Sequence, residues 1–251
     1  MKEPWKLDRT RHWVIGCIVI TLLGYAVDAG AYEVDFHYYV VYLILRARNY
    51  PPATADQLAG FSQFVDDNSA TEPLYTFSAN RGRFHFAGSG PEVATVANVQ
   101  DARDQVSRAF AEYAAGQANG KYLVGAALHL MADTFSHATF TAWWDRRINR
   151  RLGSWRGYFG HADTEEAGHA PDRPYNQVKT ALAAASAIYA LVPPVPGGAT
   201  VPWSTIDAQL APVFASQTPT VPSLSVRIQK IRDVLKRQFE DARYTKAKFA
   251  C

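Results

Sequence analysis

Apolar residues recur at helical spacing along most of the chain. In Asp35–Arg48 they occupy nearly every position, which is typical of a buried helix; the β-branched residues would also suit a strand, but a length of 14 residues favours a helix. The pair Pro51-Pro52 is expected to end this helix. The next apolar pattern predicts a helix over Ala53–Asp67, with Thr54 as its N-cap.

Five further segments show a helical pattern: Glu92–Ala115, Lys121–Asn149, Tyr175–Leu191, Ser204–Ala215 and Ser223–Lys248. Two long irregular stretches, Asn68–Pro91 and Arg150–Pro174, interrupt the pattern, and the Pro- and Gly-rich run Val192–Pro202 is expected to be a connector. The sequence contains neither an alternating strand pattern nor a hairpin signal. It therefore predicts an all-α, single-domain helical bundle with two long loops, and loops of this length are usually functional or disordered.

The first 31 residues follow the order of a secretory signal peptide. Four basic residues precede Trp13, the run Trp13–Val27 is apolar and uncharged, and Ala29-Gly30-Ala31 has small residues in A-x-A spacing. We therefore expect cleavage after Ala31, a mature α-helical domain over residues 32–251, and a secreted or periplasmic location. An N-terminal membrane anchor is the second interpretation, because an apolar run of 15 residues is shorter than the roughly 20 that span a bilayer.

The composition of the chain excludes only a few classes of function. A chain of 251 residues that is 48% hydrophobic and 20% charged suits one domain with a substantial core. Cleavage would remove four basic and three acidic residues, so the net charge would fall from +3 to +2. With dispersed basic residues, this charge argues against a stable nucleic-acid complex. Cys17 and Cys251 supply neither a disulfide framework nor a cysteine-based zinc site.

A polar stripe crosses the otherwise apolar segment Lys121–Asn149. His129, Asp133 and His137 are four residues apart, which places them on one face of a helix. The stripe is roughly 12 Å long at the helical rise, so its two histidines are too far apart to bind one ion. Neighbouring pairs that share Asp133 could each chelate an ion, which indicates two or more metals in a row; unrelated polar positions on a helix are the alternative.

Six histidines lie in the expected mature chain: His37, His85, His129, His137, His161 and His169. One buried histidine is usually a satisfied core residue, but six beside several carboxylates are harder to explain in that way. His161 and Glu165 repeat the spacing of His129 and Asp133, while Glu166 and His169 form a single competing ExxH pair. Imidazoles and carboxylates without thiolates are the ligand set of catalytic zinc, and would also suit manganese or iron.

The order of these motifs resembles the trinuclear-zinc superfamily of bacterial phospholipase C and P1-type nucleases. The segments DFHYYVVYLI, SQFVDDN, FHF, LHLMADTFSH and GHADTEEAGHAPDRPY are more similar to an uncharacterised family of that general kind, DUF6765. The resemblance extends from about Tyr32 to Tyr175.

The resemblance implies a phospholipase C/P1 nuclease-like bundle with two to three zinc ions in three ligand groups. The first group is Asp66, His85, His129 and Asp133. The second, exchangeable group is His137, His161 and Glu165. The third is His37, the other oxygen of Asp133 and the α-amino group of Tyr32 that cleavage would free.

Several ligand assignments stay open. The carboxylate of the second group could be Glu165, Asp163 or Asp172, and His169 could replace either His161 or Glu165. If Tyr32 is not the terminus, Asp35 is the natural substitute, because it lies two residues before His37.

Clustered zinc ions suit hydrolysis of phosphate esters, because they neutralise phosphoryl oxygens and lower the pKa of a bound water. We expect a phospholipase C-like phosphodiesterase in which Asp66 positions or deprotonates the attacking water and Asp133 bridges metals. The expected partner is a small phosphate ester or a lipid head group, with transient membrane-surface contact. The alternatives are a P1-type nuclease or nucleotidase, and a non-catalytic metal-binding protein on the same scaffold.

Overall fold

The computed structural model describes residues 33–68, 70–71, 84–85, 97, 99–136, 178–215 and 224–249. The described chain forms a π-helical turn, seven α-helices and a 3-10 turn, with no strand. In chain order they are η1 (Asp35–Val40), α2 (Val41–Ala47), α3 (Pro52–Asp67), α4 (Gln100–Ala114), α5 (Gly120–Ser136), α9 (Val178–Leu191), α10 (Trp203–Ala215), α11 (Leu224–Gln238) and η4 (Lys246–Lys248). The prediction of an all-α single domain is confirmed for this part of the chain.

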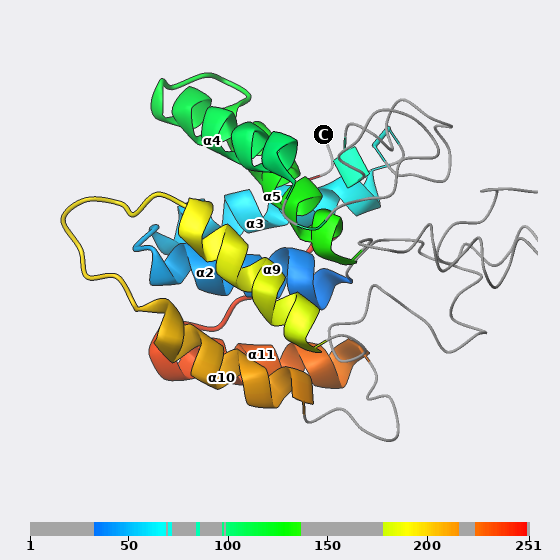
Figure 1. Ribbon diagram of the computed structural model, residues 1–251, viewed down its shortest axis with the longest axis vertical. Coiled ribbons are helices and arrows are strands. Elements are labelled where there is room, and N and C mark those ends of the chain that lie inside the picture. Colours follow the sequence, from blue (N-terminus) through cyan, green and yellow to red (C-terminus); the bar gives the residue numbers. More distant parts are fainter. Residues whose placement is uncertain are drawn as a thin grey trace, which may run out of the picture.

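Helix α5 occupies the centre of the bundle (Figure 1). It packs against α3 and α4 on one side and against α9 on the other, while α10 and α11 form a further pair next to α9 and η1. Every residue from Val124 to Ser136 in α5 is buried. Polar groups on this helix therefore need partners inside the protein, because water does not reach them.

Two glycines allow unusually close packing around α3. A Cβ atom at Gly125 would lie 2.4 Å from the Cβ of Phe61 and 2.8 Å from the backbone nitrogen of Ser62. A Cβ atom at Gly60 would overlap the ring of Phe249, which packs there from the C-terminal segment. The close approach of α3 and α5 matters for the site, since Asp66 and His129 each follow these contacts by one helical turn.

The first helical segment begins at Asp35 and α3 ends at Asp67, as predicted, but the boundary between them differs from the prediction. Helix α2 ends at Ala47, and Asn49 turns the chain with a positive φ of 69°. Helix α3 then begins at Pro52, with Pro51 as a cap residue that makes no side-chain cap bond. The Thr54 N-cap was therefore wrong, because proline fits the first helical position, where no backbone N–H is needed.

The last helix is shorter than predicted. Helix α11 ends at Gln238 rather than Lys248, and the chain from Phe239 turns back across η1 and α2 before the short turn η4. The bonds that stop the helix are tertiary: Glu240 accepts from Tyr42 and from Arg46. The apolar periodicity of a segment does not show which distant residues it contacts, so it could not predict this helix end.

The described residues contain no helix with the length and hydropathy that a bilayer crossing requires. The expected signal peptide over residues 1–31 lies outside the described residues, as do most of both predicted loops and the predicted end of the central helix after Ser136.

Candidate metal centre

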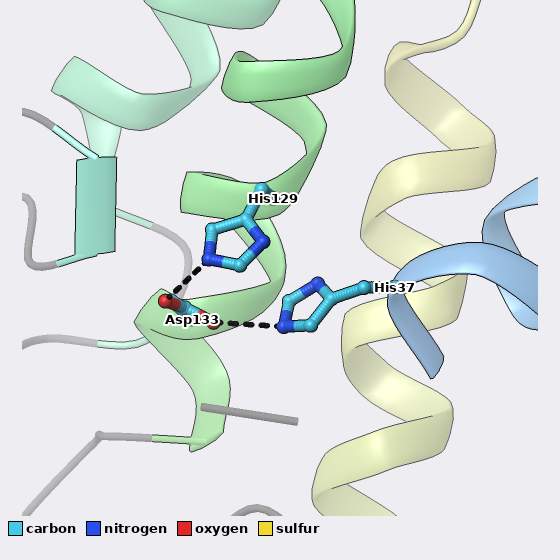
Figure 2. Close-up of side chains that lie close together, drawn as sticks. All are labelled: His37, His129 and Asp133. Atoms are coloured by element: carbon cyan, nitrogen blue, oxygen red, sulfur yellow. Dashed lines mark ion pairs between the residues drawn. The ribbon is translucent and has the colours of Figure 1, made fainter. Parts of the chain in front are cut away.

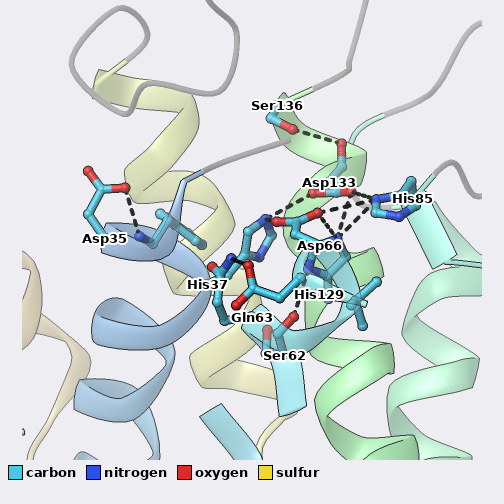
Figure 3. Close-up of polar contacts among 12 residues, drawn as sticks. Asp35, His37, Ser62, Gln63, Asp66, His85, His129, Asp133 and Ser136 are labelled. Atoms are coloured by element: carbon cyan, nitrogen blue, oxygen red, sulfur yellow. Dashed lines mark hydrogen bonds and ion pairs between the residues drawn. The ribbon is translucent and has the colours of Figure 1, made fainter. Parts of the chain in front are cut away.

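Five predicted ligands from four separate segments lie together in the interior (Figure 3). His37 comes from η1, Asp66 from the last turn of α3, His85 from the described pair 84–85, and His129 and Asp133 from α5. Four of them are at most 1% exposed, and the side chain of Asp66 is 9% exposed. The i, i+4 spacing on α5 and the close approach of α3 bring these groups to one point.

The first ligand group contains two imidazole nitrogens and two carboxylate oxygens. His129 Nε2 lies 3.1 Å from His85 Nδ1, 3.2 Å from Asp133 Oδ2 and 3.5 Å from Asp66 Oδ1. His85 Nδ1 lies 3.2 Å from the same Asp133 oxygen and 3.8 Å from the same Asp66 oxygen. Ligands at about 2.1 Å around a tetrahedral zinc lie about 3.4 Å apart, so these separations between the two histidines, and from the histidines to each carboxylate, suit ligands of one ion.

Backbone carbonyls set the tautomers of both histidines in this group. His129 Nδ1 lies 2.9 Å from the carbonyl oxygen of Ser62, and His85 Nε2 lies 3.0 Å from that of Thr71. A carbonyl only accepts, so each of these nitrogens carries the hydrogen and donates it. In the neutral rings, His129 Nε2 and His85 Nδ1 then present lone pairs toward each other and toward the two carboxylates.

His37 contacts the side of the two carboxylates that faces away from His129, as Figure 2 shows for Asp133. Its Nε2 lies 3.3 Å from Asp133 Oδ1 and 3.9 Å from Asp66 Oδ2. The rings of His37 and His129 stack with their centroids 3.9 Å apart. Asp133 and Asp66 each turn one oxygen toward the first group and the other toward His37, which is the arrangement of bridging carboxylates.

Charges in this interior shift the pKa values of the central pair. Burial alone would raise the pKa of Asp133, but the charge and hydrogen bond of His129, with hydrogen bonds from His37 and His85, hold it well below its usual range. Burial lowers the pKa of His129, despite the opposing effect of Asp133. The Asp133 carboxylate is therefore ionised, as metal coordination requires, when a positive charge lies beside it.

The donor set is chemically suited to a divalent cation. Two overlapping groups could hold an ion: His37, His129 and Asp133, and Asp66, His85 and His129. Converging lone pairs and ionised oxygens repel one another when buried, and either a cation or extra protons on the rings must neutralise them. The fixed tautomers and the lowered pKa of His129 favour the cation.

The other predicted ligands, Tyr32, His137, His161 and Glu165, lie outside the described residues, as do the alternatives Asp163, His169 and Asp172. The described part of the centre therefore covers the first group and the His37 side of the third group.

The substitution of Asp35 for Tyr32 as a ligand is wrong. Asp35 Oδ2 accepts a hydrogen bond of 2.8 Å from Arg227 Nε, and Asp35 Oδ1 accepts from the backbone N–H of Phe36. In Figure 3 the Asp35 carboxylate points away from Asp133 and His85. Asp35 and His37 are close in sequence in the motif DFH, but in η1 their side chains point to different sides.

Sequence reasoning missed three supporting residues. Ser62 and Thr71 act through their backbone carbonyls, which every residue type has, so no residue signal could have revealed them. Arg227 was not singled out within the predicted helix Ser223–Lys248, yet it is only 2% exposed. Its position on the apolar stripe of α11, beside Ile231, Val234 and Leu235, was the available signal.

The profile of one protein family matches most of the described centre. It is DUF6765, described as a family of unknown function, and it matches residues 32–110 and 91–189, which together cover more than half of the chain. No curated protein and no solved structure matches the chain.

Proposed function

The chain belongs to the DUF6765 family, and from the chemistry of its buried His/Asp cluster we propose that it is a zinc-dependent hydrolase of phosphate esters. One observation carries the proposal: two histidines with fixed tautomers and two carboxylates converge in the interior at separations that suit a tetrahedral ion. The order of the motifs resembles that of phospholipase C and P1-type nucleases. This resemblance supports the choice of reaction and the proposal that the chain has the fold of that superfamily.

The proposed ligand assignment follows from which oxygens face which ring. His85, His129, Asp133 Oδ2 and Asp66 Oδ1 hold one ion. His37 and Asp133 Oδ1 contribute to another, together with the α-amino group of Tyr32. A third ion uses His137, His161 and Glu165. When bound, the ions supply Lewis acidity that lowers the pKa of a coordinated water and neutralises phosphoryl oxygens.

Asp66 is the residue best placed to act on the attacking water. Its side chain is 9% exposed, which is more than that of the other four clustered ligands, and it lies at the end of α3. Its Oδ2 lies 3.9 Å from His37 Nε2, a long contact that leaves the oxygen room to orient a water or to accept its proton. Asp133 is fully buried and bridges the two sides of the cluster.

The proposed substrate is a small phosphodiester or a lipid head group, met at a membrane surface outside the cytoplasm after signal-peptide cleavage. The net charge of only +3 favours such substrates over long nucleic acid. Release of product from dinucleotides but not from phosphatidylcholine would instead favour the P1-type nuclease or nucleotidase. N-terminal sequencing of the secreted protein tests cleavage after Ala31.

A second candidate is a non-catalytic metal-binding protein on the same scaffold. The observation that favours it is the complete burial of His37, His129 and Asp133, since a structural metal needs no access to substrate. Its ions would stabilise the bundle without exchanging with solvent. This candidate and the hydrolase predict the same metal content but different activity.

Activity on a phosphodiester separates the two candidates. We expect the zinc-loaded protein to hydrolyse bis-p-nitrophenyl phosphate, and Asp66→Asn to lower kcat about 100-fold or more, because a positioned base typically contributes that much. Asp67→Asn is the matched control, since Asp67 is the next carboxylate on α3 but bonds to Tyr244. A metal-loaded wild type without activity on any phosphate ester would favour the non-catalytic candidate.

A further inference from the structure

Arg227 is the only lysine or arginine that is buried among the described residues. It belongs to α11, which packs against η1, and its Nε donates to Asp35 Oδ2 over 2.8 Å. Its Nη2 forms an ion pair with the carboxylate of Glu33, the residue two positions before Asp35. We call Glu33, Asp35 and Arg227 the Arg227 cluster; it joins the last long helix to the segment that carries His37.

The Arg227 cluster is linked to His37 through the backbone. The second oxygen of Asp35 accepts the N–H of Phe36 over 3.0 Å, and Phe36 precedes His37 directly. The N–H groups of Phe36 and His37 both donate to the carbonyl of Glu33, at 2.9 and 3.2 Å. The two carboxylates that Arg227 binds therefore belong to the residues that start the turn on which His37 is placed.

That turn has a rare hydrogen-bond geometry. Residues Asp35–Val40 form a π-helix, in which the N–H of Val41 reaches the carbonyl of Phe36 five positions earlier. π-Helical turns are rare, are less stable than α-helix, and occur mostly at functional sites, where they move a side chain out of the α-helical register. A shift of this segment into α-helical register would rotate His37 about the helix axis.

His37 tolerates little displacement. Its side chain is fully buried, its ring stacks on His129, and its Nε2 lies 3.3 Å from Asp133 Oδ1. Ligand geometry must be held within a fraction of an ångström for tight metal binding, and groups that hold ligands in place are part of such sites. A change in the register of η1 would remove His37 Nε2 from both carboxylates.

The general alternative is that the Arg227 cluster only stabilises the fold. A buried ion pair is weak evidence for that role, because desolvation of the charges offsets most of their attraction. Burial lowers the pKa of Arg227 to about 10, so the guanidinium is still charged at neutral pH. Desolvation of these charges is costly. The Arg227 cluster is therefore better explained by the position in which it holds the η1 turn than by a gain in stability.

We propose that Arg227 is a positioning residue of the metal centre, which acts through Glu33 and Asp35 to hold η1 in the register that directs His37 Nε2 at Asp133. The proposal rests on the proposed function, since it requires ions on both sides of the bridging carboxylates. It extends the centre to helix α11, outside the part of the chain that matches the family.

The test is a double-mutant cycle read by zinc titration against a chromophoric chelator, with no activity assay. Arg227→Gln is expected to weaken binding of the ion held by His37 about tenfold or more, as loss of a supporting residue does in other metal sites, and to spare the ion held by His85 and His129. His37→Ala should remove the same ion, and the double variant should bind no worse than His37→Ala alone. Arg237→Gln is the matched control, because Arg237 is exposed on the same helix.

The outcomes separate the two proposals. If the wild type binds both ions and Arg227→Gln binds them with unchanged affinity, the positioning role is contradicted while the metal centre stands. Equal weakening of both ions, or additive losses in the double variant, would indicate a general effect on folding and would also contradict it. A wild type that binds no zinc would contradict the proposed function, and this inference with it. Arg227→Lys keeps the charge but loses the planar guanidinium that can bind two carboxylates at once, and it is expected to bind the His37 ion with intermediate affinity.

Discussion

At the scale of single residues, the centre depends on which atom each ring turns inward. His85 and His129 each donate from one ring nitrogen to a backbone carbonyl and turn the other nitrogen to the carboxylates. Asp66 and Asp133 each use both oxygens. The hydrogen bonds from the two histidines to backbone carbonyls therefore decide which ring nitrogens face the carboxylates.

The Ser62 contact gives a residue-scale prediction with an internal control. His129→Ala should lose the ion held with His85, because it removes one of the two imidazole ligands. Ser62→Ala should keep the full metal complement, since the bond to His129 uses the backbone carbonyl that alanine also has. Elemental analysis of the two purified variants checks this. Full zinc content in His129→Ala would remove helix α5 from the site.

At the scale of elements, the close approach of α3 and α5 fixes the distance between the ligands that they carry. A methyl group at Gly125 would lie 2.7 Å from the carbonyl carbon of Phe61, in addition to its contact with the side chain. Since the backbone of α3 blocks the way, the helices must move apart to admit it. The displacement would reach Ser62 and Asp66 on α3 and His129 on α5.

We therefore expect Gly125→Ala to destabilise the protein and to weaken metal binding together. Overpacking typically costs roughly 1–3 kcal/mol, which outweighs the gain of about 1 kcal/mol that alanine brings to a helix interior. Chemical denaturation and zinc titration measure the two effects. A more stable variant with unchanged zinc affinity would show that α3 and α5 are not held at this distance.

The C-terminal segment gives a prediction about pH. Burial alone would raise the pKa of Glu240, but hydrogen bonds from Arg46 and Tyr42 lower it below its usual range. Its bonds therefore stabilise the fold fully above the ordinary glutamate pKa of about 4.3, and that stability is lost as the pH falls through the lowered folded-state value.

Glu240→Gln should lower the free energy of unfolding by about 1 kcal/mol at pH 7, a modest value because solvent screens this half-buried pair. The deficit should shrink as the pH falls below about 4. Urea denaturation at several pH values measures it, with Glu112→Gln on the exposed face of α4 as the control. A deficit that does not change with pH would contradict the assignment to charge.

At the scale of the whole molecule, the sequence predicted the fold class and the positions of the main helices. It did so because apolar periodicity reports which face each helix buries. It also indicated five clustered residues, since histidines and aspartates are costly inside apolar helices unless they have a role. It could not predict the end of α11, the carbonyl partners of the histidines or the Arg227 cluster, because those contacts join residues far apart in the chain.

Metal removal should affect the entire bundle, because the ligands come from η1, α3 and α5 and the segment that carries His85. A ligand that binds only the folded state adds about 2.7 kcal/mol of stability at a free concentration of 100 times its Kd. We expect chelation to lower Tm and readdition of zinc to restore it. An unchanged Tm after complete removal of bound zinc would argue against a cluster that joins these helices.

The most direct test of the metal centre is anomalous scattering at the zinc edge from crystals of the zinc-loaded protein. We predict one peak about 2.1 Å from His85 Nδ1 and His129 Nε2, and another beside His37 Nε2, with Asp66 and Asp133 between the two. Zinc peaks elsewhere in the molecule and none among these five side chains would contradict the account.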